Sequence, residues 1–191
     1  VTYAVKANPA DEVIAQLVAG GMTAFDVASP QEIDLIRRHA PNADLHYNNP
    51  VRGKSEILMA MAAGVQSWSV DDLGELEKLA TLGAKGEVSV RFKLPVAGAA
   101  YNFGSKFGAE ESEAIFLLQR AAALGFAPGL TFHVGTQCAD AAAWTTYIHA
   151  AARIAQKAGI TIKRLNVGGG FPALRHGAAT DLGPYFAAIE T

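Results

Sequence analysis

Residues 1–8 have the sequence VTYAVKAN, an apolar, β-branched and aromatic run that ends at Lys6 and is followed by Pro9. Such a run is typical of a buried strand in a parallel sheet. The strand would deliver the Lys6 amine to the rim of the sheet, where α/β folds place their chemistry. In a partly desolvated site an amine can lose its proton and form a Schiff base with an aldehyde. A solvated lysine that merely follows a strand would give the same pattern, so this motif alone does not decide between the two interpretations.

Composition narrows the function classes. The chain has 191 residues, of which 50% are hydrophobic and 18% charged, with a formal net charge of -2. These values predict a globular protein with one sizeable core, and the absence of Lys/Arg clusters argues against nucleic acid or an acidic membrane as partner. We expect a small-molecule partner and no bound metal. The sequence has no run long enough to span a bilayer and no signal-peptide pattern, and the single cysteine, Cys138, cannot form an internal disulfide, so a cytoplasmic location is expected.

Short β-rich runs alternate with longer amphipathic runs along the whole chain. The predicted strands are Thr2–Lys6, Ala24–Ala28, Leu45–Asn48, Gln66–Val70, Val88–Lys93, Leu130–Val134 and Leu165–Val167. The predicted helices are Asp11–Ala19, Gln31–His39, Lys54–Ala63, Asp72–Leu82, Glu110–Leu124 and Ala141–Ala158. Strand-helix units with crossovers of this length indicate a parallel α/β sheet.

Two parallel architectures compete, an open doubly wound sheet and a closed (β/α)8 barrel of the TIM type. No Gly-x-Gly-x-x-Gly follows the first strand, which favours the barrel. A complete barrel has eight units in about 250 residues, whereas about seven units fit here. We therefore expect an incomplete barrel that lacks its last unit, with two unpaired strand edges and low stability as an isolated segment.

Polar residues recur at the predicted carboxyl ends of the strands, which converge on one mouth in a barrel. They are Lys6, Asp26, Asn48, Asn49, Arg91, His133 and the run 168–170, which has the sequence GGG. Each has a structural explanation as well: a helix cap, an ion-paired arginine, a core histidine or a tight turn. Their recurrence on one rim favours a shared functional site.

Five motifs together resemble the ornithine/diaminopimelate/arginine decarboxylases, which depend on pyridoxal 5'-phosphate and have an alanine-racemase-like barrel. The motifs are Tyr3–Asn8, Phe25–Ser29 with Glu32, Phe103–Gly108, Phe132–Thr136 and Val167–Pro172, in the order and spacing of the family. The resemblance implies that residues 1–191 are a partial cofactor-binding barrel domain. It also implies that a further C-terminal β-domain and an acidic partner of the pyridine nitrogen lie in segments absent here, so that this segment alone is inactive.

The resemblance assigns a role to each residue. Lys6 would form the Schiff base with the cofactor and later handle the proton at the decarboxylated carbon. His133 would stack on the pyridine ring, Asp26 would lie near the lysine and the cofactor, and Arg91 would lie close to the cofactor. We therefore expect Lys6, Asp26 and His133 to be catalytic, and all four to bind the cofactor.

The phosphate end of the cofactor can be argued independently, because barrels commonly bind phosphate after their seventh and eighth strands. Gly168, Gly169 and Gly170 fall there, and without Cβ atoms their backbone can approach phosphate oxygens closely. Thr136 stands where relatives often carry serine, and its hydroxyl could bind the same phosphate.

Two further residues have competing interpretations. Ser29, Pro30 and Glu32 form a capping box, in which the Glu32 carboxylate would reach the Ser29 amide; the resemblance adds proximity to the cofactor. Cys138 does not match the substrate-site cysteine of the family, and we expect an inert thiol.

Three functions follow from the resemblance. The first is decarboxylation of a basic amino acid, ornithine to putrescine in polyamine biosynthesis, with lysine as a further substrate and an active site shared across a homodimer. The second is diaminopimelate decarboxylation in lysine biosynthesis. The third is a non-catalytic regulatory homologue that binds a protein partner. The sequences of Phe25–Ser29 and His46–Pro50 resemble those of the ornithine branch more closely.

Overall fold

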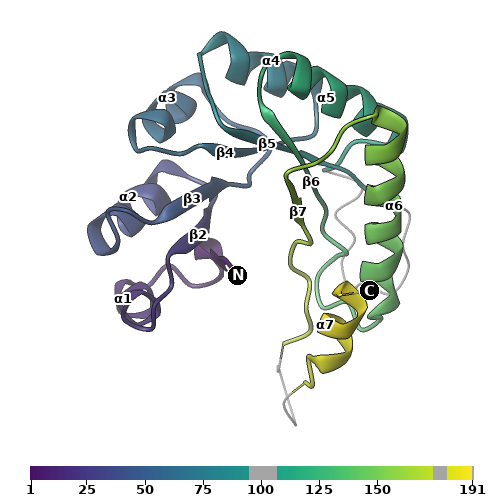
Figure 1. Cartoon of the computed structure of the whole chain (residues 1–191). Coiled ribbons are helices and arrows are strands. Elements are labelled where there is room, and N and C mark those ends of the chain that lie inside the picture. The colour runs from purple at the N-terminus through teal and green to yellow at the C-terminus, as the bar shows by residue number, and fades with distance from the viewer. Residues whose placement is uncertain (95–106, 174–179, 191) are drawn as a thin grey trace.

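The computed structural model describes residues 1–94, 107–173 and 180–190, and its strands curl into an open half-barrel covered by helices on the convex side (Figure 1). The strands are β1 (Tyr3–Ala4), β2 (Ala24–Val27), β3 (Asp44–Tyr47), β4 (Ser67–Val70), β5 (Glu87–Arg91), β6 (Ala127–Thr131) and β7 (Arg164–Asn166). The α-helices are α1 (Asp11–Ala19), α2 (Pro30–His39), α3 (Lys54–Ala62), α4 (Leu73–Thr81), α5 (Glu111–Ala123), α6 (Ala142–Ala158) and α7 (Gly183–Ile189), and Val5–Ala7 forms a short 3-10 helix.

Every strand pairs in parallel with its neighbour in the chain, in the order β1-β2-β3-β4-β5-β6-β7. The crossovers are helical, as a parallel sheet requires. In Figure 1 the curl is open between β1 and β7. The prediction of an incomplete (β/α)8 barrel with seven strands is therefore confirmed.

The hydrophobic core fills the space between the sheet and its helices. Trp68 on β4, Leu76 on α4 and Trp144 on α6 are fully buried. Near the carboxyl ends of β5 and β6, the rings of Phe132 and Tyr147 stack with their centroids 4.6 Å apart. The Tyr147 hydroxyl also donates to the Leu94 carbonyl at 3.3 Å and accepts from the Leu94 amide at 3.0 Å, so α6 holds the chain where it leaves β5.

Strand ends differ from the sequence-based bounds at two places that matter for the site. The predicted strand Thr2–Lys6 ends at Ala4, because the Asn8 amide donates to the Val5 carbonyl at 3.2 Å and closes a 3-10 turn. The turn buries Val5 and leaves Lys6 exposed. The strand predicted as Leu130–Val134 ends at Thr131, which places His133 on the following loop.

The chain has one further helix near its C-terminal end. Helix α7 was not predicted, although Pro184 in its first turn is a helix-start signal. Part of one family motif, Phe103 to Lys106, lies outside the described residues. Among the residues that are described, no helix is long and apolar enough to cross a membrane.

Candidate active site

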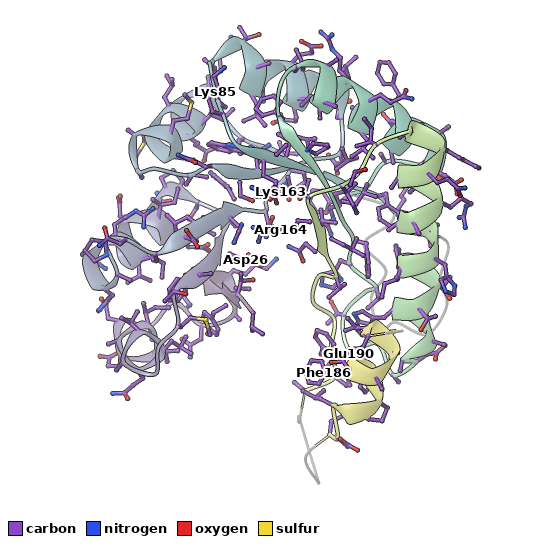
Figure 2. All side chains as sticks on the ribbon, in the orientation of Figure 1. Asp26, Lys85, Lys163, Arg164, Phe186 and Glu190 are labelled. Atoms are coloured by element: carbon purple, nitrogen blue, oxygen red, sulfur yellow. The ribbon has the colours of Figure 1, made fainter. Side chains whose placement is uncertain are left out.

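The concave face of the sheet is polar, unlike the branched apolar filling common in TIM-type barrels. Side chains alternate along a strand, so Glu87, Ser89 and Arg91 of β5 share one face. Neighbouring strands continue a polar row, because Asp26 is in register with His46, which is in register with Ser67. Figure 2 shows Asp26 and Arg164 on this concave side.

A polar brace crosses the amino-terminal part of this concave face. Glu87, which is 3% exposed, accepts from the Arg164 Nε at 2.9 Å. The Arg164 Nη1 lies 3.3 Å from Nε2 of His46, so β7 reaches β3 across the curl. Burial, followed by the positive charge of Arg164, lowers the pKa of His46, which favours the neutral imidazole. The brace therefore gives the buried Glu87 carboxylate a positively charged partner. The candidate functional residues lie at the opposite, carboxyl ends of the strands.

Lys6 and Asp26 lie at the carboxyl ends of β1 and β2. The Lys6 side chain projects from the 3-10 turn into solvent rather than from the strand itself. Oδ1 of Asp26 is buried and has no hydrogen-bond partner among the described residues. Burial raises the pKa of Asp26, although the charges of His46 and Lys6 and hydrogen bonds from Thr2 and Asn48 oppose that shift. Asp26 is thus a carboxyl group near the Lys6 amine, and one of its two oxygens has no hydrogen-bond partner among the described residues.

His133 follows β6 on the same rim. Its Nδ1 accepts a hydrogen bond from the Gly135 amide at 3.0 Å, so this nitrogen carries no proton and the neutral ring is protonated on Nε2. Burial lowers the pKa of His133 to about 4, and the positive charges of Arg91 and Lys6 add to the effect. The site therefore contains a flat, neutral imidazole at physiological pH.

Arg91 is the last residue of β5 and contributes a partly buried positive charge. Its Cζ lies 5.1 Å from the centroid of the Phe107 ring. Burial lowers the pKa of Arg91 and the negative charge of Asp71 raises it, but guanidinium stays charged at any physiological pH. Arg91 ends β5, His133 follows β6 and Lys6 follows β1, so all three lie on the carboxyl-end rim of the parallel sheet.

The three glycines after β7 differ in what their missing Cβ allows. Gly168 has φ +66°, and a Cβ there would lie 2.0 Å from the Phe132 carbonyl oxygen. Gly170 has φ +99°, and its Cβ would lie 2.2 Å from the Gly135 oxygen. At Gly169 the nearest atom to an added Cβ would be Nε2 of His133, at an ordinary 3.5 Å. Backbone packing accounts for Gly168 and Gly170, but neither packing nor a positive φ requires glycine at 169.

Thr136 lies half-buried on the loop that connects β6 to α6. This loop packs directly on the glycine segment, because the Cys138 amide donates to the Gly170 carbonyl at 2.8 Å and Gly135 contacts Gly170. The structure therefore brings Thr136 and the glycines into one pair of adjoining loops. Cys138 is fully buried, and its thiol donates to the Asp140 carbonyl at 3.5 Å.

Glu32 takes part in a helix cap, as predicted, but its carboxylate accepts from a different backbone amide than expected. The Ser29 hydroxyl accepts from the Glu32 amide at 3.3 Å, as a capping box requires. The Glu32 carboxylate, however, accepts from the Ala28 amide at 2.7 Å and not from Ser29. Ser29 is extended, with φ -155° and ψ 160°, and successive amides of extended backbone point to opposite sides. The described contacts of Glu32 are those of a helix cap and do not join it to Asp26 or His133.

Sequence reasoning missed several residues that order the rim. The Asn166 side chain accepts from the Gly168 amide at 2.8 Å, an Asx turn that an Asn before a glycine run could have indicated. Buried Arg52 donates to the carbonyls of Tyr47, Asn49 and Ser69, and so ties the ends of β3 and β4 together. No sequence signal marks that role, because the three acceptors are backbone atoms.

The arrangement combines an accessible amine, a buried carboxyl, a neutral imidazole and a glycine segment with space beside one Cα. An amine and a carboxyl in this position can hold a carbonyl compound and shift protons. A glycine segment in which some residues have a positive φ can point its backbone amides toward an anion. These groups suit a small ligand that carries both a carbonyl and an anionic group.

Comparisons with known proteins agree with this chemistry. Residues 1–190 match the family model described as pyridoxal-dependent decarboxylase, pyridoxal binding domain. The chain is 34% identical over 196 residues to the lysine/ornithine decarboxylase of Selenomonas ruminantium, covering 100% of this chain and 50% of that protein. It is 34% identical over 175 residues to the ornithine decarboxylase of Mus musculus, covering 89% of this chain and 38% of that protein.

Among solved structures, the chain resembles the lysine/ornithine decarboxylase of Vibrio vulnificus complexed with cadaverine. The TM-score is 0.83 at 26% identity, covering 99% of this chain and 52% of that chain. The chain thus spans half or less of the length of the Selenomonas ruminantium and Mus musculus enzymes. Because the family model covers nearly every residue, pyridoxal phosphate is confirmed as the cofactor, and the chain belongs to the pyridoxal-dependent decarboxylase family as its pyridoxal-binding domain.

Proposed function

We propose that residues 1–191 are the partial barrel domain of a longer protein that decarboxylates a basic amino acid, with L-ornithine as the main substrate and L-lysine as the second. The observation that carries the proposal is the convergence of Lys6, Asp26, Arg91 and His133 on the rim that also holds the glycine segment. The names of the similar proteins, which are ornithine and lysine/ornithine decarboxylases, support the substrate class.

The residues present fit pyridoxal phosphate. Gly169 leaves a space in front of the His133 ring that a Cβ would fill. The buried Oδ1 of Asp26 lacks a partner among the described residues and could accept a hydrogen bond. The exposed amine of Lys6 lies close enough to affect the pKa of both residues. When bound, the cofactor supplies an electron-withdrawing ring that stabilises the charge left on carbon as carbon dioxide departs.

Each proposed role is a task that this chain's own side chain can perform. The Lys6 amine would hold the cofactor covalently and would then deliver or accept the proton at the carbon that loses its carboxylate. His133, which is neutral, would pack against the ring of the cofactor, and a neutral imidazole would avoid a second positive charge there. Asp26 orients the amines in the site, and Arg91 keeps this end of the barrel positive.

The phosphate is proposed to bind between Thr136 and the amides of Gly168, Gly169 and Gly170. Two features support this placement: the loops of these residues pack on each other, and Gly169 has room beside it. Glu32 remains among the proposed cofactor residues only through the family resemblance, because its described hydrogen bonds are those of a cap.

Two alternatives remain open to test, diaminopimelate decarboxylation and a regulatory homologue without activity. The second is disfavoured because the amine, the carboxyl and the imidazole are all retained on one rim. A cytoplasmic location, a role in polyamine biosynthesis and a homodimer with shared active sites also remain predictions.

The test is to load the full-length protein with pyridoxal phosphate and to assay it with ornithine, lysine and diaminopimelate, one substrate at a time. The carbon dioxide released and the amine product are measured for each substrate. Putrescine as the main product supports the proposal, whereas lysine formed from diaminopimelate would establish the first alternative. Bound cofactor without turnover would establish the second.

Borohydride reduction followed by peptide mapping should place the cofactor on Lys6, and an adduct on another lysine would contradict that assignment. Lys6→Arg should lose nearly all turnover and keep the fold, because arginine retains the charge but forms no imine.

A further inference from the structure

Gln137 has an unusual backbone conformation next to the proposed phosphate site. Its φ is +52°, and it is the single non-glycine residue with a positive φ in the part of the chain that the structure describes. This left-handed region is strained for a residue with a Cβ, and such strain persists only where the surroundings impose it. Gln137 directly follows Thr136 and precedes Cys138, in the loop that packs on the glycine segment.

The Gln137 side chain makes two hydrogen bonds to a single residue on the other loop. Its Oε1 accepts from the Ala173 amide at 2.6 Å, and its Nε2 donates to the Ala173 carbonyl at 3.4 Å. Both polar ends of the amide are therefore used on the backbone of Ala173. This pairing offsets the strain of the left-handed backbone and explains why the conformation is stable with a residue other than glycine.

The pairing completes a set of contacts along the segment after β7. Asn166 holds the amide of Gly168, the Cys138 amide holds the carbonyl of Gly170, and Gln137 holds Ala173. Between the first two contacts, Gly169 faces the His133 ring with ordinary spacing. The segment is thus fixed on both sides of the one glycine whose missing Cβ leaves space.

We propose that Gln137 is a positioning residue that holds the glycine segment against the Thr136 loop, so that both loops contact the same phosphate. The inference rests on the proposed placement of the cofactor phosphate between these loops. Gln137 itself does not touch the reacting atoms. Its left-handed backbone turns the chain between Thr136 and Cys138, and its side chain sets the distance between the two loops.

The test compares Gln137→Met with Gln137→Gly in the full-length apo protein. Methionine keeps the length of the side chain and removes both hydrogen bonds, whereas glycine removes them and relieves the backbone strain as well. The readouts are the dissociation constants for pyridoxal phosphate and for pyridoxal, which lacks the phosphate, and the apo melting temperature. We expect both variants to lose affinity for pyridoxal phosphate by about tenfold, the effect of roughly one hydrogen bond, with less than a twofold change for pyridoxal.

Gln119→Met is the matched control, because the Gln119 side chain also donates to a backbone carbonyl, that of Ala158, but between α5 and α6. It should lower the apo melting temperature and leave the preference for pyridoxal phosphate over pyridoxal unchanged. Equal losses for the two ligands, or no loss, in the Gln137 variants would overturn the inference. If Gln137→Met does not fold, Gln137→Gly gives the measurement, since glycine suits the local φ. A wild-type protein that bound both ligands equally well would instead contradict the phosphate placement itself.

Discussion

Nε2 of His133 lies 3.5 Å from the position that a Cβ on Gly169 would occupy. A Cβ on Gly168 or on Gly170 would instead lie 2.0 or 2.2 Å from a backbone carbonyl oxygen. The three glycines are therefore not equivalent. Two of them are required for the loops to pack, and the third leaves a space in front of an imidazole.

Alanine substitutions should separate these roles. Gly169→Ala should leave the apo melting temperature within about 2 °C of wild type and weaken pyridoxal phosphate binding by roughly one to two orders of magnitude, as loss of a charge-assisted hydrogen bond would. Gly168→Ala and Gly170→Ala should instead destabilise the apo protein, because their Cβ atoms would collide with carbonyl oxygens. Calorimetry and a cofactor titration measure both effects. A Gly169→Ala protein with unchanged affinity would rule out the proposed placement of the phosphate.

Asp26→Asn should stabilise the apo protein while removing turnover. Burial raises the pKa of Asp26, so keeping its carboxylate ionised at neutral pH lowers the free energy of unfolding. The neutral amide of asparagine avoids this desolvation cost. We expect a rise in melting temperature of about 2–4 °C, which corresponds to about 1 kcal/mol in a domain of this size. The rise should shrink as the pH falls and the carboxyl of the wild-type protein becomes protonated. A drop in stability at neutral pH would mean that the charges and hydrogen bonds around the carboxylate outweigh the cost of its burial, which would contradict the raised pKa.

His133 should make the apo protein less stable in mild acid. Between pH 6.5 and about pH 4 the unfolded imidazole binds a proton that the folded one does not, so the free energy of unfolding falls as the pH falls through this window. Below about pH 4 both states are protonated and the contribution no longer changes. His133→Phe should lose this part of the pH dependence, whereas His149→Asn on the exposed side of α6 should keep it. Denaturant unfolding at a series of pH values provides the comparison, and parallel curves for wild type and His133→Phe would contradict the lowered pKa.

The contact between Glu87 and Arg164 should show strong coupling. Arg164→Met would leave the carboxylate of Glu87 buried without its main partner, which we expect to cost about 1–3 kcal/mol, less than for a fully buried pair because the Arg164 side chain is 44% exposed. The double variant Glu87→Leu with Arg164→Met should recover most of that loss. Urea unfolding of the single and double variants closes the cycle, and additive losses would show that the pair is not coupled.

The sequence contains most of the fold because the relevant signals are local. Helix α1 has the predicted bounds Asp11–Ala19, since Pro9 and the acidic first turn mark its start and Gly20 follows its end. The turn at Lys6 was not predicted, because an apolar run that ends in a 3-10 helix looks the same as one that continues as a strand. Helix α7 was missed because a helix of 7 residues between loops carries little periodic signal.

The site was predicted less evenly. Lys6, Asp26, Arg91 and His133 could be found because strand ends converge in a barrel and because a family resemblance supplied their roles. Gln137 and Arg52 could not be found, because their partners are backbone atoms brought close only by the folded chain. The Glu32 contact shows the same limit, since the choice between the Ala28 and Ser29 amides depends on the local dihedral angles.

The order of the strands also bears on how the domain is made. Because each strand pairs with the one before it, a unit can dock as soon as the ribosome releases it, without waiting for any later strand. The residues of the rim, in contrast, come from opposite ends of this sequence of events: Lys6 is synthesised first, and the glycines at 168–170 are synthesised more than 150 residues later. If the amine and the glycine segment bind the cofactor as proposed, a nascent chain that has formed only β1 to β6 holds the Lys6 amine and still lacks the phosphate half of the proposed site.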